Sequence, residues 1–272
     1  MVIRRGILTI DGTDPSGSMQ VLAPDVTWNP DGYERAVNAQ LSKIALQPVG
    51  ALLLQTIRRQ VWIVPNPRPH AAAAAGALGD TPAEASRGFR AGHQVRNPRT
   101  GEPFPGFGQG TGNGAGATVL YTPGEWIDGS RLRGKRVGPG SSADQVLFHE
   151  LFHAMRVTNG LLDTRPLRGE LAEYDNFAEF FCIMVSNIYI SQSTGGALRS
   201  NHRANGPALT TPMSFTWNEN HQRLIRILCA DQPVFTRAIA LQRAFFNPFR
   251  DHYIGTGEIT NRDIRVHHQA QQ

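Results

Sequence analysis

The run His149-Glu150-Leu151-Phe152-His153 is the most informative stretch of this chain, because it indicates both a helix and a metal-binding pair of histidines. Ser142 and Gln145 form a capping box ahead of a periodic apolar stretch, and Asn159-Gly160 supplies a C-terminal stop. These signals predict a helix over residues 142–157. On that helix the two histidines lie on one face about one turn apart, so both imidazoles can reach one tetrahedral metal ion.

The glutamate inside the run has a different role. Glu150 sits about 100° around the helix from His149, which is too far to complete the ligand set but close enough to hydrogen-bond a zinc-bound water. It is therefore the candidate general base. The spacing is that of the HExxH motif of zinc peptidases. The alternative is a core helix whose histidines are satisfied by hydrogen bonds.

A catalytic zinc needs a third protein ligand and keeps a fourth position open for water. The acidic residues that follow the motif before a long stretch without acids are Asp163, Glu170, Glu173, Asp175 and Glu179. Residues 171–190 read as one helix with broad apolar coverage, typical of a helix buried beneath a site. Glu179 lies in its middle, where an unpaired carboxylate would be expensive to desolvate. This cost favours Glu179 as the third ligand.

The neighbouring candidates have simpler interpretations. Glu173 and Asp175 lie near the start of that helix, where their charges complement the helix dipole. Cys182 could bind zinc, but a single cysteine on an apolar helix is usually a small core residue. Cys182 and Cys229 both lie in apolar helical runs, so no disulfide scaffold is indicated.

The motif, followed 26 residues after His153 by Glu179, resembles the gluzincin metallopeptidases. The run 174–189 (YDNFAEFFCIMVSNIY) is more closely similar to bacterial effector peptidases, namely type III effectors that cleave host kinases and the metallopeptidase domain of a type VI spike protein. Residues 198–202 (LRSNH) and 245–250 (FFNPFR) extend the resemblance, and 48–57 does so faintly. The resemblance implies His149, His153 and Glu179 as zinc ligands and Glu150 as base.

Two positions depart from the family patterns. Thermolysin-like gluzincins place an acid one turn after the ligand glutamate to orient a zinc histidine, but Ile183 stands there. Toxin-type gluzincins often carry a tyrosine seven residues before that glutamate to stabilise the oxyanion, and that position is Ala172. Tyr174, Tyr189 and His202 are the remaining candidates for the oxyanion donor. We favour His202, because the Gly-containing loop 194–197 could fold it over the cleft.

Length and composition fit one domain. A chain of 272 residues with 40% hydrophobic residues can bury a single core. No run reaches transmembrane length, and the N-terminal apolar stretch is too short for a Sec signal peptide. Together with the resemblance, this suggests a protein made in the bacterial cytoplasm and secreted by a specialised system to act in the cytoplasm or periplasm of a target cell. A secretion spike and an immunity protein are the partners so implied.

The net charge of +5 comes almost wholly from arginine. A basic surface could favour nucleic acid or an anionic membrane surface. The arginines are scattered, however, and no aromatic platform or nucleic-acid motif accompanies them. We therefore expect a solvated basic face and a protein or peptide substrate rather than nucleic acid.

The organisation outside the motif predicts an α+β fold. Helical periodicity covers 33–46, and further helices are expected at 217–230 and 234–246. Strands are expected at 60–64 and 117–122. Pro48 and Gly50 indicate a break in regular structure between the first helix and the first of these strands. Residues 66–116 read as a loop-rich Ala/Gly/Pro insertion and 256–272 as a disordered tail. The resemblance implies a zincin-like domain over 1–272, with a small sheet over the HExxH helix, the strand at 117–122 as its substrate-pairing edge, and a helical C-terminal half.

Two functions of different classes follow as hypotheses. The first is a zinc-dependent endopeptidase of the effector or toxin type, in which the metal activates water and Glu150 transfers the proton. The second is a basic module that binds nucleic acid or an envelope surface and carries a structural zinc. A structural site would be closed by a fourth protein ligand and would not need Glu150.

Overall fold

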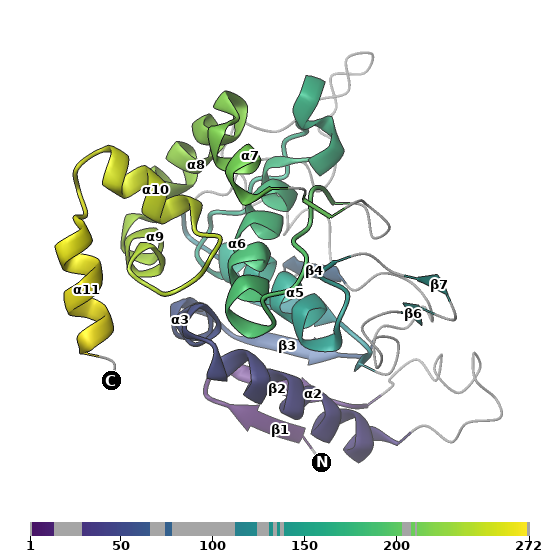
Figure 1. Ribbon diagram of the computed structural model, residues 1–272. Coiled ribbons are helices and arrows are strands. Elements are labelled where there is room, and N and C mark those ends of the chain that lie inside the picture. Colours follow the sequence, from purple (N-terminus) through teal and green to yellow (C-terminus); the bar gives the residue numbers. More distant parts are fainter. Residues whose placement is uncertain are drawn as a thin grey trace.

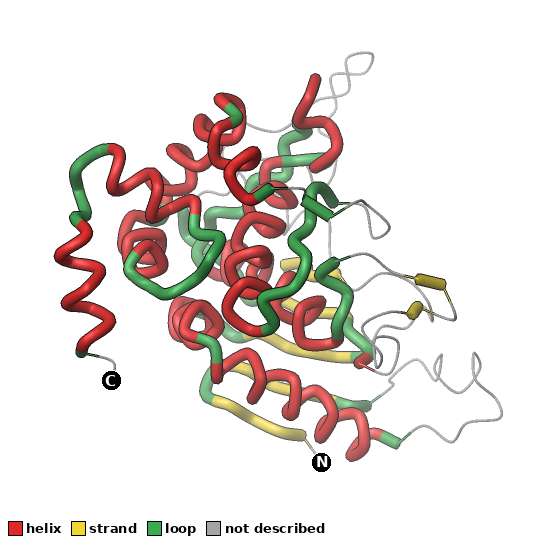
Figure 2. Tube along the Cα trace, viewed as in Figure 1, coloured by secondary structure: helices red, strands yellow, loops and turns green. Residues whose placement is uncertain are grey.

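The computed structural model describes residues 2–13, 29–65, 112–123, 139–202, 208–209 and 211–270, and the backbone of 74–77, 131–132 and 135–136. These residues form a mixed α+β structure in which helices predominate (Figure 2). Most of the predicted insertion at 66–116 lies outside the described residues.

Five of the described strands form one sheet in the order β1-β2-β3-β5-β4; Figure 1 labels all of them except β5. They are β1 (Val2–Arg5), β2 (Leu8–Asp11), β3 (Val61–Val64), β5 (Ala117–Leu120) and β4 (Ala74–Ala77). The pairs β2–β3 and β3–β5 are parallel, whereas β1–β2 and β4–β5 are antiparallel. A separate antiparallel ladder joins β6 (Arg131–Leu132) to β7 (Lys135–Arg136).

The expectation that the strand at 117–122 is an edge is wrong. β5 has β3 on one side and β4 on the other, with Val119 opposite both Ile63 and Ala75. Its alternating buried residues gave no sign of a further partner, because β4 comes from an Ala/Gly run without strand periodicity. The edge on this side of the described sheet is therefore β4.

Two helices connect the parallel strands β2 and β3. Helix α2 (Pro30–Leu46) begins at Asn29, whose side chain accepts from the Gly32 N–H at 2.9 Å, and it buries Tyr33, Val37, Leu41 and Ile44 along one face. Helix α3 (Pro48–Thr56) follows directly, although Pro48 and Gly50 predict a break in regular structure here. Pro48 is the first residue of that helix, a position where proline's fixed φ favours helix formation.

Helix α5 (Ala143–Thr158) carries the HELFH run through the centre of the molecule. It contacts α2, α3 and the β4–β5 side of the sheet, and packs against α6 on its other side (Figure 1). Every residue from Leu147 to Thr158 is buried. The predicted capping box is present, with the Ser142 N–H donating to Gln145 Oε1 at 3.4 Å.

The predicted continuous helix over 171–190 is divided in two. A 3-10 helix, η2 (Gly169–Tyr174), ends at Asp175, whose φ is +62°. A new helix, α6 (Phe177–Ser193), begins after Asn176, whose side chain accepts from the Glu179 N–H at 3.0 Å. Because asparagine is a strong N-cap residue, Glu179 falls in the first turn of α6 and not in the middle of a helix.

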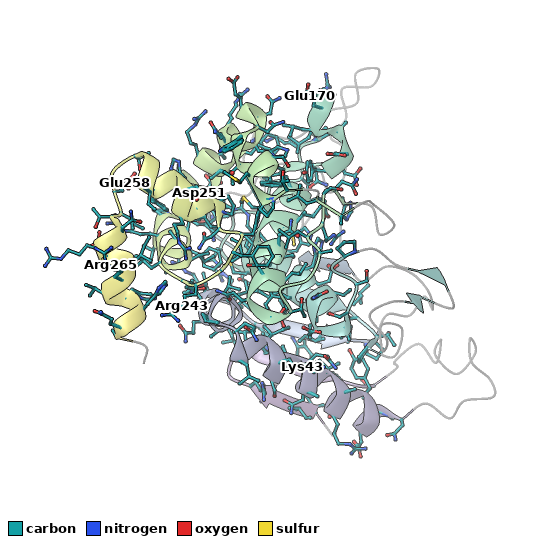
Figure 3. The ribbon with its side chains drawn as sticks, in the orientation of Figure 1. Lys43, Glu170, Arg243, Asp251, Glu258 and Arg265 are labelled. Carbon is teal, nitrogen blue, oxygen red and sulfur yellow. The ribbon has the colours of Figure 1, made fainter. Side chains whose placement is uncertain are left out.

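Short helices complete the fold: α7 (Pro212–Trp217), α8 (Glu219–Asp231), α9 (Pro233–Ala240), α10 (Pro248–Gly255) and α11 (Asn261–Gln269). The expected disordered tail contains α11, which has a capping box between Thr260 and Asp263 and a 2.8 Å contact from His268 to the Leu241 carbonyl. On this outer helix the Arg265 side chain extends away from the molecule (Figure 3). None of the helices among the described residues combines the length and apolar character needed to cross a membrane.

Candidate metal centre

The HELFH run of helix α5 buries three titratable side chains among apolar neighbours. His149, Glu150 and His153 are 6%, 6% and 7% exposed, and they are surrounded on the same helix by fully buried Phe148, Leu151 and Phe152. The two histidine Nε2 atoms lie 3.3 Å apart. Burial of three titratable groups on one helix is costly unless a common partner compensates for it.

The carboxylate of Glu179 is a common partner of the two histidines and offsets part of the cost of burying them. Its Oε2 atom lies 3.2 Å from Nε2 of His149 and 3.3 Å from Nε2 of His153. The three atoms thus form a nearly equilateral triangle. Ligands at the zinc–nitrogen distance of about 2.0–2.1 Å around a tetrahedral ion are separated by about 3.3 Å, so the triangle fits one face of such a tetrahedron.

His149, His153 and Glu179 shift one another's pKa values. Burial would raise the pKa of Glu179, but the charge of His153 and hydrogen bonds from both histidines hold it well below its usual range. Burial lowers the pKa of His149 to about 3. For His153, burial opposes protonation, yet Cys182 and Glu179 raise its pKa well above the usual value. Contacts with the two histidines therefore favour the ionised form of the Glu179 carboxylate despite its burial.

A second group of side chains approaches Glu179 from the loop after α6. His202 Nε2 lies 3.1 Å from Glu179 Oε2, while its Nδ1 lies 2.6 Å from Oδ2 of Asp175. The His202 ring also stacks on that of His149, with centroids 6.1 Å apart. The structure thus brings His202 to the exposed side of the triangle, where the sequence analysis placed an oxyanion donor.

The predicted tyrosine candidates lie elsewhere. The Tyr189 hydroxyl donates to Asp144 at 2.8 Å, and its ring stacks on Phe148 with centroids 4.4 Å apart. The Tyr174 hydroxyl donates to the Ser200 carbonyl at 2.6 Å. Both side chains are buried and their hydroxyl protons are engaged, so each contributes to support around the triangle: Tyr189 ties α6 to the start of α5, and Tyr174 anchors the loop that carries His202.

Cys182 lies directly behind the histidines. Its thiol donates to the His149 carbonyl at 2.9 Å, and it contacts the His153 side chain. Burial raises the pKa of this thiol to about 11. Cys182 comes about one turn after Glu179 and is next to Ile183. Ile183 stands where thermolysin-like gluzincins have the acid that orients a zinc histidine, so Cys182 is the polar side chain nearest to that position in the sequence.

The sequence analysis did not assign a role to Arg199. Its Nη1 lies 3.4 Å from Nδ1 of His149, and its Nη2 donates to the His202 carbonyl at 3.1 Å. Burial lowers the pKa of this guanidinium, an effect that Cys182, Glu179 and Glu150 oppose. The sequence carried little indication of this role, because Arg199 lies 46 residues after the motif and has no periodic or spacing relationship to it.

Two sets of these buried and half-buried groups could hold a metal ion: His149 with His153 and Cys182, and His149 with Glu179 and His202. In each set the ligand atoms lie within 4.8 Å of one another. His149 belongs to both. The clustering of donors therefore centres on His149, with Glu179 as the carboxylate closest to it.

No protein-family model, curated protein or solved structure matches this chain in comparisons with known proteins.

Proposed function

We propose that this protein is a zinc-dependent endopeptidase, with His149, His153 and Glu179 as the metal ligands. The triangle of Nε2, Nε2 and Oε2 atoms with edges of 3.2–3.3 Å is the observation that carries the proposal. Two imidazoles and one carboxylate form a ligand set of catalytic zinc sites, which keep a fourth position open. The small sheet beside the HExxH helix accords with a zincin-like domain.

A zinc ion held by His149, His153 and Glu179 would supply Lewis-acid chemistry: it would lower the pKa of a coordinated water and polarise the scissile carbonyl. Glu150, next to His149 on α5, accepts the proton of the attacking water and returns it to the leaving amine. His202, held by Asp175, donates a hydrogen bond to the oxyanion that develops. Glu179 has a second role in this arrangement, because its Oε2 also contacts His202 and so orients that ring.

The resemblance to effector peptidases in residues 174–189 suggests the biological role. A secreted effector or toxin that cleaves one protein in a target cell would combine this chemistry with the charged, mostly arginine-based surface. Its partners would be a secretion spike during delivery and an immunity protein in the producing cell.

A second function is favoured by one contact. If His202, at 3.1 Å from Glu179 Oε2, were a fourth ligand, the site would be closed and structural. The protein would then be a basic binding module, for nucleic acid or an envelope surface, in which zinc stabilises the fold. The carboxylate of Glu150 would have no chemical task.

Glu150→Gln separates the two functions, because it removes the base while keeping size and polarity. The variant should retain its zinc and thermal stability, while cleavage of an unfolded test protein such as casein, or toxicity on expression in bacteria, falls at least ~10²-fold. Glu219→Gln, at an exposed position on α8, is the matched control and should behave as the parent protein. Undiminished activity of Glu150→Gln would exclude the peptidase and favour the binding module.

A further inference from the structure

Two neighbouring hollows are formed by residues of α7, α8 and α10. Their volumes are about 440 and 470 Å³. Thr216, Trp217, Asp251 and Gly255 line both hollows, so the two are adjacent, and together they are called the α7–α10 groove below. No residue of the candidate metal centre lines either hollow, so the groove is a separate feature of the surface.

The groove gathers large apolar side chains that are open to solvent. Trp217 and Met213 on α7 are 68% and 55% exposed, and Phe245, shortly before α10, is 54% exposed. Ile254 on α10 is 39% exposed, and all four side chains line the hollow of 470 Å³. Aromatic and methionine side chains that meet at one exposed site are typical of a protein interface.

An exposed carboxylate in this groove has no partner within the chain. Figure 3 shows Asp251 on α10, and its side chain forms no hydrogen bond or ion pair with the residues that the structure describes. The neighbouring Arg250 directs its guanidinium at the carbonyls of Ala240 and Gln242 instead. Surrounding protein atoms desolvate the Asp251 carboxyl and raise its pKa, an effect that Arg250 opposes only in part. A cation supplied from outside the chain would therefore stabilise the ionised form.

An arginine in the same groove also lacks an ionic partner. Arg226 on α8 is exposed and lines the hollow of 440 Å³ together with Trp217 and Asp251. Within the described part of the chain its guanidinium forms no ion pair, and it is not paired with Asp251. The groove thus carries one unpaired charge of each sign beside an apolar centre.

A surface that carries both members of an unformed ion pair is complementary to a second copy of itself. In a two-fold interface, residue i of one subunit contacts residue j of the other, and j contacts i. We propose that the α7–α10 groove is the contact surface of a homodimer, in which the apolar side chains pack together and Asp251 of each protomer pairs with Arg226 of the partner subunit. Two ion pairs then form from four charges that are unpaired in the single chain, and both copies of Trp217 leave water. An unrelated protein would have to match this arrangement of charges independently.

Sedimentation velocity of the full chain over about 1–200 μM measures the proposed association. The wild-type protein should reach the mass of two chains as its concentration rises. Trp217→Ala should raise the dissociation constant at least about 30-fold, because it removes the large side chain that both hollows share. Leu46→Ala, which removes an exposed apolar side chain from α2, is the control and should dimerise as the parent protein does.

Charge reversal tests the predicted ion pairs and the two-fold symmetry. Asp251→Arg and Arg226→Asp should each remain at the mass of one chain, because like charges then face each other across the interface. An equal mixture of these two variants should dimerise again, because one ion pair is then native and the other has its signs exchanged.

Three outcomes would overturn the homodimer. Wild-type protein that keeps the mass of one chain at the highest concentration would exclude it and leave the groove to a different protein. A dimer that persists in Trp217→Ala and in both charge-reversal variants would place the contact on another surface. A mixture of the two charge-reversal variants that stays at the mass of one chain would contradict the pairing of Asp251 with Arg226.

Discussion

Nδ1 of His202 lies 2.6 Å from Oδ2 of Asp175, a residue at φ +62°, which is uncommon outside glycine. The contact leaves Nε2 directed at the metal centre, as an oxyanion donor requires. We therefore expect His202→Ala to lower kcat by roughly 10 to 10³-fold without changing metal content. Asp175→Asn should reduce kcat less, because it retains a polar partner for Nδ1.

Two outcomes would change the assignment of His202. Loss of metal in His202→Ala would make it a ligand and support the closed, structural site. An active His202→Ala together with an inactive Tyr174→Phe or Tyr189→Phe would transfer the oxyanion role to that tyrosine. Since both hydroxyls already donate elsewhere, to Ser200 and Asp144, we expect the tyrosine variants to affect stability more than kcat.

The ligand set predicts the metal stoichiometry. Purified protein should carry about one zinc ion per chain, and His153→Ala or Glu179→Ala should lose it, because either change opens one corner of the triangle. Glu173→Ala is the control, since Glu173 precedes α6 and contacts Asn201 instead. Elemental analysis showing full zinc in Glu179→Ala would point to the alternative set that includes Cys182.

The central helix and the strands at 61–64 and 117–120 could be predicted because their signals are local. The α5 helix matches its capping box and stop signal within about one residue. Helix α3 was missed, since Pro48 and Gly50 favour a break when considered alone. In the structure, Gly50 approaches the end of α2 so closely that a Cβ would lie 2.0 Å from the Ile44 carbonyl oxygen. Tertiary packing thus gives that glycine its role.

In the candidate site too, residues in local sequence patterns could be predicted, whereas residues that act through contacts distant in the sequence could not. Glu179 was singled out by its desolvation cost, but the division of the chain into η2 and α6 was missed, because Asn176 is read as a cap only where the helix is known to begin. The support from Cys182 and Arg199 was also missed. Both act through contacts with His149 over 33 and 50 residues of sequence, and no periodicity connects such positions.

Metal affinity should increase with pH. Although burial lowers it, the pKa of His153 is raised overall by Cys182 and Glu179, so the metal-free protein keeps a proton on this ring beyond the usual histidine range. That proton must leave before Nε2 can bind metal. Zinc affinity should therefore rise, by up to about tenfold per pH unit, until His153 has deprotonated. Chelator competition between pH 6 and 9 measures this, and a flat profile would contradict the raised pKa of His153.

The cap at the start of α6 should affect both stability and the metal centre. Asn176 Oδ1 accepts from the backbone N–H of Glu179 at 3.0 Å, so it fixes the turn that carries the ligand carboxylate. Loss of an asparagine N-cap costs about 1 kcal/mol, within a range of about 0.5–2 kcal/mol. Asn176→Ala should therefore lower the free energy of unfolding by that amount and should also weaken zinc binding, because the first turn frays around Glu179.

The chain contains a matched control for this effect. Asn218 caps α8 in the same way, with its side chain accepting from the His221 N–H at 3.1 Å, but it carries no ligand of the candidate centre. Asn218→Ala should cost a similar free energy in urea unfolding while leaving zinc affinity unchanged. If both variants bind zinc as tightly as the parent protein, the orientation of Glu179 does not depend on its cap. If both weaken zinc binding equally, the effect comes from global stability and not from the turn at Asn176.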